Sequence, residues 1–383
     1  MPDENLEVVG RFRWNRLPTV YETFIEEEGV PIVRGLGVYD VREVTLGPWK
    51  RTGGNGAYLE LNGVGGKSGL YLLEIPPGGA INPEKHMYEE NFYVVEGRGT
   101  TEIWNDSNPH RKQVFEWQQG SLFSPPINTT HRLVNAASSP ALLLAATNAP
   151  PIMALYRSRR FIFANPYEFE DRYEGNGDYF KPAEQLVTHP ESGRYVNPGN
   201  LIPDTLNCEV PLENQRGAGH RHFGWRLSEN TFYGFLAEYP PGRYSKAHYH
   251  PSGPVVVCLK GKGYSITWPT SIGIRPWENG KGHLVKRQDY TAGGLVSAAP
   301  GGDNWYHAHF GTDKGNFRVL AFLGGWPRPV FGAPGDEHTW NLDQTQGGNT
   351  IEYRDEDPQI RKDFLVALEK EGAEFQMPES VYR

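Results

Sequence analysis

Three histidines in the second half of the chain have the types and the spacing of a metal site. His248 and His250 flank Tyr249, and His307 follows later in the same half. Side chains two residues apart in a β-strand point to the same face, so His248 and His250 can converge on one point. A third imidazole from a later strand completes a facial set that suits zinc, iron, copper or nickel and leaves coordination positions open. Two unrelated, partly exposed histidines are the alternative.

The surroundings of this pair occur twice in the chain. Residues 73–78 (LEIPPG) recur 164 residues later as residues 237–242 (AEYPPG), and the register continues without a gap to Trp104 and Trp268. At this offset the aligned pairs are Glu84 with His248, His86 with His250, and Glu90 with Pro254. A second block follows each copy, residues 120–135 with His131 and residues 294–307 with His307. The chain therefore contains two versions of one β-rich domain, each with its own candidate ligands.

These blocks resemble the two sequence motifs of the cupin family. The first copy matches them at Gly78, His86, Glu90, Gly97, Gly120, Pro126, His131 and Asn135. It departs from them at Glu84, where the first histidine belongs, and at Asn128, which replaces a glycine. The second copy matches at Gly242, His248, His250, Gly261, Gly294, Pro300, Gly302 and, after a two-residue insertion, His307. Pro254 stands at its glutamate position, and no matching Asn follows.

The resemblance implies an all-β fold of two cupin barrels, that is, double-stranded β-helix or jelly-roll barrels, with short flanking helices. Composition agrees, because 45 glycines and 31 prolines supply many turns. Short apolar runs bounded by Gly or Pro, such as residues 92–95, 141–145 and 254–259, predict strands. Helices are predicted only over residues 19–28 and 357–370, each followed by a glycine that favours a helix end.

We therefore expect five segments. They are a helical or irregular arm (1–50), an N-terminal barrel (51–150), an inter-barrel connection (151–205), a C-terminal barrel (206–330) and a tail with a helix (331–383). The connection is too rich in aromatic residues for a solvated linker, so we expect it to pack across the barrels or against a second subunit. Bicupins commonly form oligomers, and the resemblance therefore implies a homo-oligomer.

Charge and cysteine content exclude several classes of function. The net charge is -8 and the chain has no basic cluster, which argues against nucleic acid as a partner. No apolar run approaches the length of a membrane span, and the acidic start does not have the pattern of a signal peptide. Two cysteines cannot build a disulfide framework. We expect a cytoplasmic protein that binds neither nucleic acid nor membrane.

The second copy has the ligand set of an oxygen-activating site. Three neutral imidazoles leave a divalent ion its full charge, which favours an anionic chelating substrate and leaves a position for dioxygen. Because Pro254 cannot ligate, the resemblance narrows to three-histidine cupins such as the gentisate and salicylate dioxygenases, which typically use Fe(II). In gentisate-type enzymes the functional site lies in the N-terminal barrel, whereas the three-histidine set here is C-terminal. His309 competes with His307 as the third ligand; we favour His307 and expect His309 to hydrogen-bond beside the metal.

The first copy offers two nitrogens and two carboxylates at Glu84, His86, Glu90 and His131. Such a set suits manganese or iron. The alternative is a degenerate barrel in which these residues bond only to one another. A metal-binding first copy would resemble the manganese cupins, such as oxalate decarboxylase, and would favour decarboxylation.

Further residues are candidates for the substrate pocket. Arg221 or Arg243 could pair with a substrate carboxylate, although a solvated loop arginine is the more common case. Trp305 and Tyr306 are candidates for the pocket wall, while Tyr249 should point away from the metal. His220 and His222 form a second His-x-His pair outside the cupin motifs and are interpreted as loop or supporting residues.

Together these observations predict a metal-dependent bicupin, most simply an Fe(II) dioxygenase. It would use O2 to cleave a carbon–carbon bond in a small hydroxy-aromatic acid or enolisable dicarbonyl, and no catalytic residue beyond the metal ligands is required. One rival is a decarboxylase or isomerase that uses Mn(II) or another divalent metal. The other is a non-catalytic bicupin that binds a small ligand.

Overall fold

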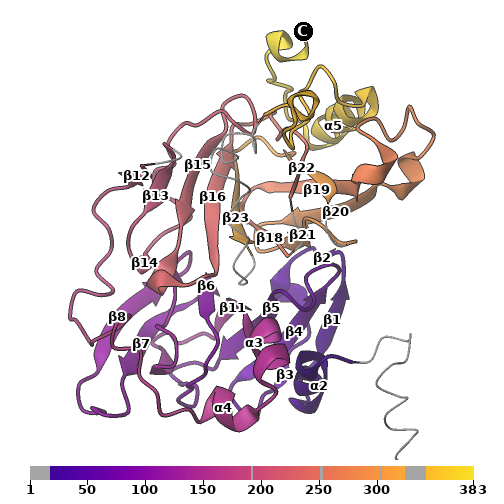
Figure 1. The fold of residues 1–383 in the computed structure, drawn as a ribbon. Helices are drawn as coiled ribbons and strands as arrows, with labels where there is room; N and C mark the ends of the chain where they lie inside the picture. Colours follow the sequence, from indigo (N-terminus) through magenta and orange to yellow (C-terminus); the bar gives the residue numbers. More distant parts are fainter. Residues whose placement is uncertain (1–17, 191–192, 251–252, 302–303, 324–341) are drawn as a thin grey trace, which may run out of the picture.

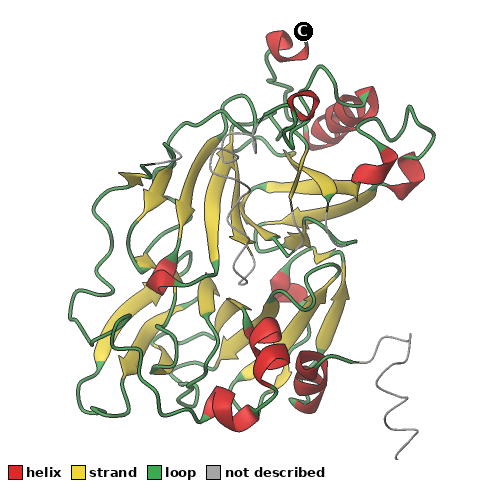
Figure 2. Ribbon diagram, viewed as in Figure 1, coloured by secondary structure: helices red, strands yellow, loops and turns green. Residues whose placement is uncertain are grey.

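The computed structural model describes residues 18–190, 193–250, 253–301, 304–323 and 342–383. Strands dominate, in two barrels that lie one above the other in Figure 1, and the few helices sit around them (Figure 2). Each barrel consists of one large and one small sheet. The predicted all-β class with two barrels and short flanking helices is therefore confirmed.

The first barrel has a large sheet and a three-stranded sheet. In spatial order the large sheet contains β1 (Ile32–Gly35), β4 (Asn55–Leu61), β5 (Gly69–Ile75), β11 (Ala141–Thr147), β6 (Glu90–Glu96), β9 (Leu122–Phe123) and β14 (Leu201–Ile202), with β3 (Gly47–Pro48) paired to β4. The small sheet contains β10 (Thr130–Asn135), β7 (Arg98–Trp104) and β8 (Gln113–Gln118).

The second barrel repeats this plan. Its large sheet contains β12 (Val187–Thr188), β13 (Tyr195–Asn197), β15 (Arg221–Trp225), β16 (Tyr233–Tyr239), β23 (Phe317–Leu323), β18 (Val255–Lys260), β21 (Leu295–Ser297) and β2 (Gly37–Val38). Its small sheet contains β17 (His248–His250), β22 (Trp305–Gly311), β19 (Lys262–Pro269) and β20 (Lys286–Thr291). The neighbours β5, β11, β6 and β9 of the first barrel correspond to β16, β23, β18 and β21 of the second.

The two large sheets pack face to face, which explains their long apolar runs. Alternate side chains of a strand point to opposite faces. In β5, Leu70 and Leu72 enter a core shared with Leu236, Val257 and Leu320 of the second barrel. Tyr71, Leu73 and Ile75 on the other face of β5 line the interior of the first barrel. Strands such as β11 are thus buried on both faces and cannot show the polar alternation of a half-exposed sheet.

Each barrel completes its large sheet with a strand from outside its own segment. β2, from the segment expected to be a helical or irregular arm, pairs with β21 of the second barrel, while β1 from the same arm pairs with β4 of the first. β14, from the connection between the barrels, pairs with β9 of the first barrel. The arm and the connection therefore contain short strands. These strands form at the edges of the large sheets through pairing with distant segments, which the local sequence propensity does not indicate.

The helices are few and have clear ends. α2 (Val20–Glu27) begins at a capping box formed by Thr19 and Glu22, and α5 (Pro358–Glu371) begins at Asp357 and ends at Gly372, which has a φ of 63°. These two helices lie at the predicted ranges. α3 (Ala149–Tyr156) and α4 (Arg159–Phe163) follow the first barrel. The short 3-10 turns are η1 (Val41–Glu43), η2 (Leu227–Glu229), η3 (Thr270–Ile272), η4 (Gly282–Leu284), η6 (Gln344–Gln346) and η7 (Glu379–Tyr382).

α5 covers the outer face of the small sheet of the second barrel. Its Phe364 packs in one cluster with Tyr306, Ala308 and Phe310 of β22. Alternate residues of β22, including His307 and His309, therefore face the barrel interior. Among the described residues, the longest helices fall short of what a membrane crossing requires in length and apolar character.

Candidate metal centres

Three side chains of the first barrel converge on one point. His86 precedes β6, Glu90 begins β6, and His131 lies on β10. One ligand atom from each lies within 4.8 Å of the others, and all three residues are buried. His86 Nε2 is 3.3 Å and His131 Nε2 is 3.5 Å from the same carboxylate oxygen, Glu90 Oε2. Among the described residues this is the group whose spacing fits a metal ion.

Both imidazoles are oriented by their own backbone. His86 Nδ1 lies 2.8 Å from the carbonyl oxygen of Tyr88, and the Tyr88 ring stacks on the imidazole with centroids 3.7 Å apart. His131 Nδ1 lies 3.4 Å from the carbonyl oxygen of Thr129. A proton on Nδ1 leaves the Nε2 lone pair for a ligand, which is the arrangement that metal-binding histidines usually have. His131 Nε2 is buried without a hydrogen-bond partner, so the residues fit a divalent metal.

The charge state of Glu90 suits a metal ligand. Burial raises the pKa of its carboxyl, but His86 and His131 lower it more, and the net pKa is well below its ordinary value. Burial lowers the pKa of His131. The Glu90 carboxylate raises it by more, so the net pKa of this imidazole is above its ordinary value. The second carboxylate oxygen of Glu90 accepts a hydrogen bond from the Tyr71 hydroxyl. Metal binding at this site would release the proton that the raised pKa of His131 retains on the imidazole.

Glu84 does not join this group, because its carboxylate is paired with Arg51. Arg51 also binds Glu28, with its Nε 2.6 Å from Glu28 Oε2, and its guanidinium lies over the Trp49 ring at 4.8 Å. The first barrel therefore gathers a set of two imidazoles and one carboxylate from the four residues that the sequence singled out. The fourth residue forms an ion pair inside the same barrel.

Strand pairing identifies the equivalent positions in the second barrel. Glu84 and His131 face each other in an antiparallel bridge, and His248 and His307 do the same between β17 and β22. On the neighbouring strand, Ile103 pairs with His131 and Thr267 pairs with His307, which restores the 164-residue offset. His307 is therefore the positional equivalent of His131. The imidazoles of His248 and His307 lie 4.3 Å apart between ring centroids.

His309 occupies a different position on the same face of β22. It pairs with Ser265, and its Nδ1 lies 2.6 Å from the Ser265 hydroxyl. The equivalent pair in the first barrel is Thr101 and Leu133. Burial lowers the pKa of His309 to about 4, so its imidazole is neutral at pH 7.

The second-barrel set is described in part. His250 pairs with Trp305 along the backbone, and its side chain lies outside the described part of the structure. His248 and His307 direct Nδ1 toward backbone carbonyls, those of Lys246 at 3.0 Å and Trp305 at 3.3 Å. This is the orientation that His131 has in the first barrel.

The four candidate substrate residues do not gather at one place. Tyr306 lies on the outer face of β22, opposite His307, and its hydroxyl donates to Gln344. Arg221 binds the carbonyl oxygen of Val210, and Arg243 binds that of Ala218. Trp305 shares the strand face of His307.

A buried cluster that the motifs did not mark lies in the second barrel. His220 and His222 are both buried; His222 lies on β15, and His220 directly precedes that strand. His220 Nδ1 lies 2.9 Å from Glu213 Oε2. Burial lowers the pKa of His222 to about 3. The sequence signal for this cluster was the second His-x-His pair. Its three members do not come close enough together to form a metal group.

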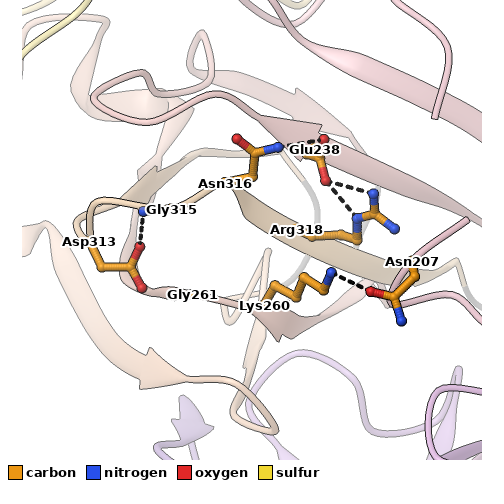
Figure 3. A pocket seen from close by; sticks show the side chains of 8 residues that line it. All are labelled: Asn207, Glu238, Lys260, Gly261, Asp313, Gly315, Asn316 and Arg318. Carbon is orange, nitrogen blue, oxygen red and sulfur yellow. Dashed lines mark hydrogen bonds and ion pairs between the residues drawn. The ribbon is translucent and has the colours of Figure 1, made fainter. Parts of the chain in front are cut away.

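A pocket of about 510 Å³ lies at the end of the large sheet of the second barrel (Figure 3). Arg318 and Glu238 form a buried ion pair there at 2.7 Å, and Lys260 donates to Asn207. A second pocket is lined by Glu74, Glu96 and Gly97, the repeat equivalents of Glu238, Lys260 and Gly261. Neither lining contains a candidate metal ligand, and three of the lining positions are equivalent in the repeat.

A protein-family model matches part of the first barrel. Residues 71–147, from β5 to the end of β11, match the family model of the Cupin domain. Together with the repeated strand order, this match supports a bicupin. A mutant of Bacillus subtilis oxalate decarboxylase is 13% identical over 75% of this chain and 76% of that chain, with a TM-score of 0.46. Vicilin from Corylus avellana (hazelnut) is 13% identical over 68% and 75%, with a TM-score of 0.42. No curated protein matches the chain.

Proposed function

We propose that this protein is a metal-dependent enzyme whose reaction centre lies in the first barrel, at His86, Glu90 and His131. The observation that carries the proposal is the convergence of two Nε2 atoms and one carboxylate oxygen, with both imidazoles oriented by backbone carbonyls. Because Glu84 lies outside the group, the set has three ligands and not the four on which the expected likeness to manganese cupins rested. A facial set of two imidazoles and one carboxylate leaves about three positions on a six-coordinate ion and is typical of non-haem Fe(II) oxygenases. We infer an Fe(II) dioxygenase that cleaves a carbon–carbon bond in a small chelating acid.

The chain contributes charge and exclusion of water. A bound Fe(II) ion would supply substrate chelation and electrons for dioxygen. Two neutral imidazoles and one carboxylate leave a divalent ion with a net charge of about +1, which favours an anionic substrate. Arg51 adds a guanidinium that can pair with a substrate carboxylate in place of Glu84. The buried rings of Tyr71 and Tyr88 exclude water beside Glu90 and His86.

One observation favours a second candidate, a redox-neutral decarboxylase or isomerase that uses Mn(II). Glu84 is buried in the same barrel, opposite His131 in the strand pairing, and its carboxylate lies outside the ligand group. A carboxylate in that place can accept or return a proton during the reaction. The His248, His250 and His307 set of the second barrel stays a proposed second metal site.

Anaerobic purification followed by metal analysis and substrate assays tests the proposal. Gentisate, salicylate, hydroxynaphthoate and diketones serve as candidate substrates, with O2 uptake and CO2 release both recorded. Bound iron and substrate-dependent O2 uptake that His86→Ala abolishes would support the dioxygenase. Bound manganese with CO2 release and no O2 uptake, lost in Glu84→Gln, would support the second candidate. A first barrel that takes up no metal would overturn both.

A further inference from the structure

The strand that carries Glu90 is linked by hydrogen bonds, through Ser124, to a turn from the other half of the chain. This turn, Leu227–Phe232, connects β15 to β16 of the second barrel. Asn230 Nδ2 donates to the Ser124 hydroxyl at 2.8 Å, and that hydroxyl donates to the carbonyl oxygen of Glu90 at 2.6 Å. Ser228 Oγ donates to the carbonyl oxygen of Ser124 at 2.7 Å. Ser124, Ser228 and Asn230 are all at most 1% exposed.

The same turn also holds the residue before Glu90. The Glu89 carboxylate accepts hydrogen bonds from the backbone N–H of Thr231 at 2.9 Å and of Phe232 at 3.0 Å. The Thr231 hydroxyl donates to it at 2.7 Å, and Asn148 donates at 3.1 Å. Consecutive residues of a strand point to opposite faces, so Glu89 reaches the second barrel while Glu90 faces the ligand group. Hydrogen bonds to an ionised carboxylate are the stronger kind, and they fix the start of β6.

Two residues of this turn have an unfavourable backbone conformation that contacts with neighbouring residues stabilise. Ser228 and Glu229 have φ values of 51° and 54°, in the left-handed region that non-glycine residues rarely adopt. Arg172 holds it by donating to the carbonyl oxygen of Ser228 at 2.7 Å and to Asn230 Oδ1 at 3.0 Å. Such strained residues occur preferentially at functional sites.

The equivalent place in the second barrel has different residues. The repeat places Gly253 at the position of Glu89, Pro254 at that of Glu90 and Ala298 at that of Ser124. Among the described residues, a side-chain hydrogen bond ties the second barrel to the first half there, from the Ser297 hydroxyl to the carbonyl oxygen of Asn62 at 2.6 Å. In the part of the chain that the structure describes, the polar brace therefore lies beside the carboxylate ligand and not at the equivalent position of the second barrel.

We propose that the turn Leu227–Phe232 is a positioning element of the first-barrel metal centre, so that the metal affinity of that centre depends on the second barrel. The inference rests on the proposed function, because it presupposes that Glu90 ligates a metal. Partners that orient a ligand typically change metal affinity by ten- to a hundred-fold when they are removed.

Titration of the metal-free full-length chain with Mn(II), followed by the EPR signal of free Mn(II), tests the inference. A His248→Ala background removes a ligand of the second barrel, so that the first barrel is titrated. We expect Ser124→Ala and Asn230→Ala each to raise the Kd about tenfold. The matched control Ser297→Ala removes a part-buried hydrogen bond that a buried serine makes between the two barrels, and it should leave the Kd within about twofold. Ser124→Ala is the safer variant for folding, because Ala298 occupies the equivalent position.

Thermal unfolding of the metal-free variants separates positioning from general stability. Ser124→Ala and Asn230→Ala each lose two side-chain hydrogen bonds and Ser297→Ala loses one, so the Tm values of the first two variants should fall somewhat further than that of Ser297→Ala. Unchanged Kd values in Ser124→Ala and Asn230→Ala, or an equal rise in Ser297→Ala, would overturn the inference while leaving the proposed function intact. A His248→Ala parent that takes up no Mn(II) would instead overturn the proposed function, and the inference with it.

Discussion

The two barrels share one strand plan but differ at the positions that matter for a metal. In the first barrel, Glu90 stands between two imidazoles and is braced from outside. In the second barrel, Pro254 removes the carboxylate, and the paired imidazoles of His248 and His307 adjoin a third, His309. The barrel that has a carboxylate at the ligand position, Glu90, also has the polar residues Glu89 and Ser124 beside it. The barrel that has Pro254 at this position has the small residues Gly253 and Ala298 instead.

The largest expected effect is loss of metal from the first barrel. His86→Ala should weaken metal binding there by more than about a hundredfold, because it removes one of three ligands. Metal content of the purified variant, measured beside His110→Ala as an exposed-histidine control, checks this. If His86→Ala keeps its metal while His248→Ala loses it, the metal centre lies in the second barrel and not in the first.

The Arg51–Glu84 pair predicts the next effect. Arg51→Met leaves the Glu84 carboxylate buried without its guanidinium partner and should lower the free energy of unfolding by about 3–5 kcal/mol. Arg132→Met, which breaks the more exposed pair with Glu102 in the same barrel, should cost about 1 kcal/mol or less. Urea unfolding measures both. Equal losses of unfolding free energy would show that the Glu84 carboxylate needs its ion pair no more than a surface carboxylate does. Adding Glu84→Gln to Arg51→Met should restore most of the lost stability.

The stability of the second barrel beside α5 should depend on pH through one buried carboxyl, that of Glu356. Burial raises the pKa of Glu356, which accepts from Tyr244, to about 8. The folded state therefore holds a proton that the unfolded state loses above its ordinary pKa of 4.5. The stability contribution is complete below about pH 4.5 and is lost as the pH rises to about 8. Glu356→Gln should remove this loss, on the order of 3 kcal/mol between pH 5 and pH 8, as measured by urea unfolding at the two pH values. Identical pH profiles in the two proteins would contradict the assignment.

The smallest expected effect concerns the extra histidine of the second barrel. Ser265→Ala leaves both the buried His309 Nδ1 and the Tyr290 hydroxyl without their Ser265 partner and should cost about 1 kcal/mol of unfolding free energy. Adding His309→Leu copies the apolar residue of the first barrel at this position, Leu133, and should recover the part of the loss that comes from His309. Chemical denaturation of the single and double variants checks the prediction. A double variant that is less stable than Ser265→Ala would show that His309 contributes through other contacts.

The fold and the ligand strands could be predicted because the repeat carries their spacing in the chain. His86, Glu90 and His131 come from neighbouring segments of one copy, and the structure brings them together. The choice between His307 and His309 stayed open because an insertion hides the register, which only the pairing with His248 reveals.

Contacts across long stretches of chain could not be predicted. Nothing near Glu84 in the sequence points to Arg51, which lies on the other side of two strands. The differences of Glu89 from Gly253 and of Ser124 from Ala298 were visible within the repeat. Their meaning depends on a turn more than a hundred residues later, and one sequence does not show what a side chain touches.

The exchange of β2 and β14 between the halves has a consequence for synthesis on the ribosome. The first barrel emerges before Leu201–Ile202 and so leaves the edge of β9 open until those residues arrive. The second barrel, in turn, closes its sheet with Gly37–Val38, which leaves the ribosome near the beginning. Open strand edges invite pairing with other chains. A nascent chain of this protein therefore reaches its protected form only when the last barrel captures a strand made at the start.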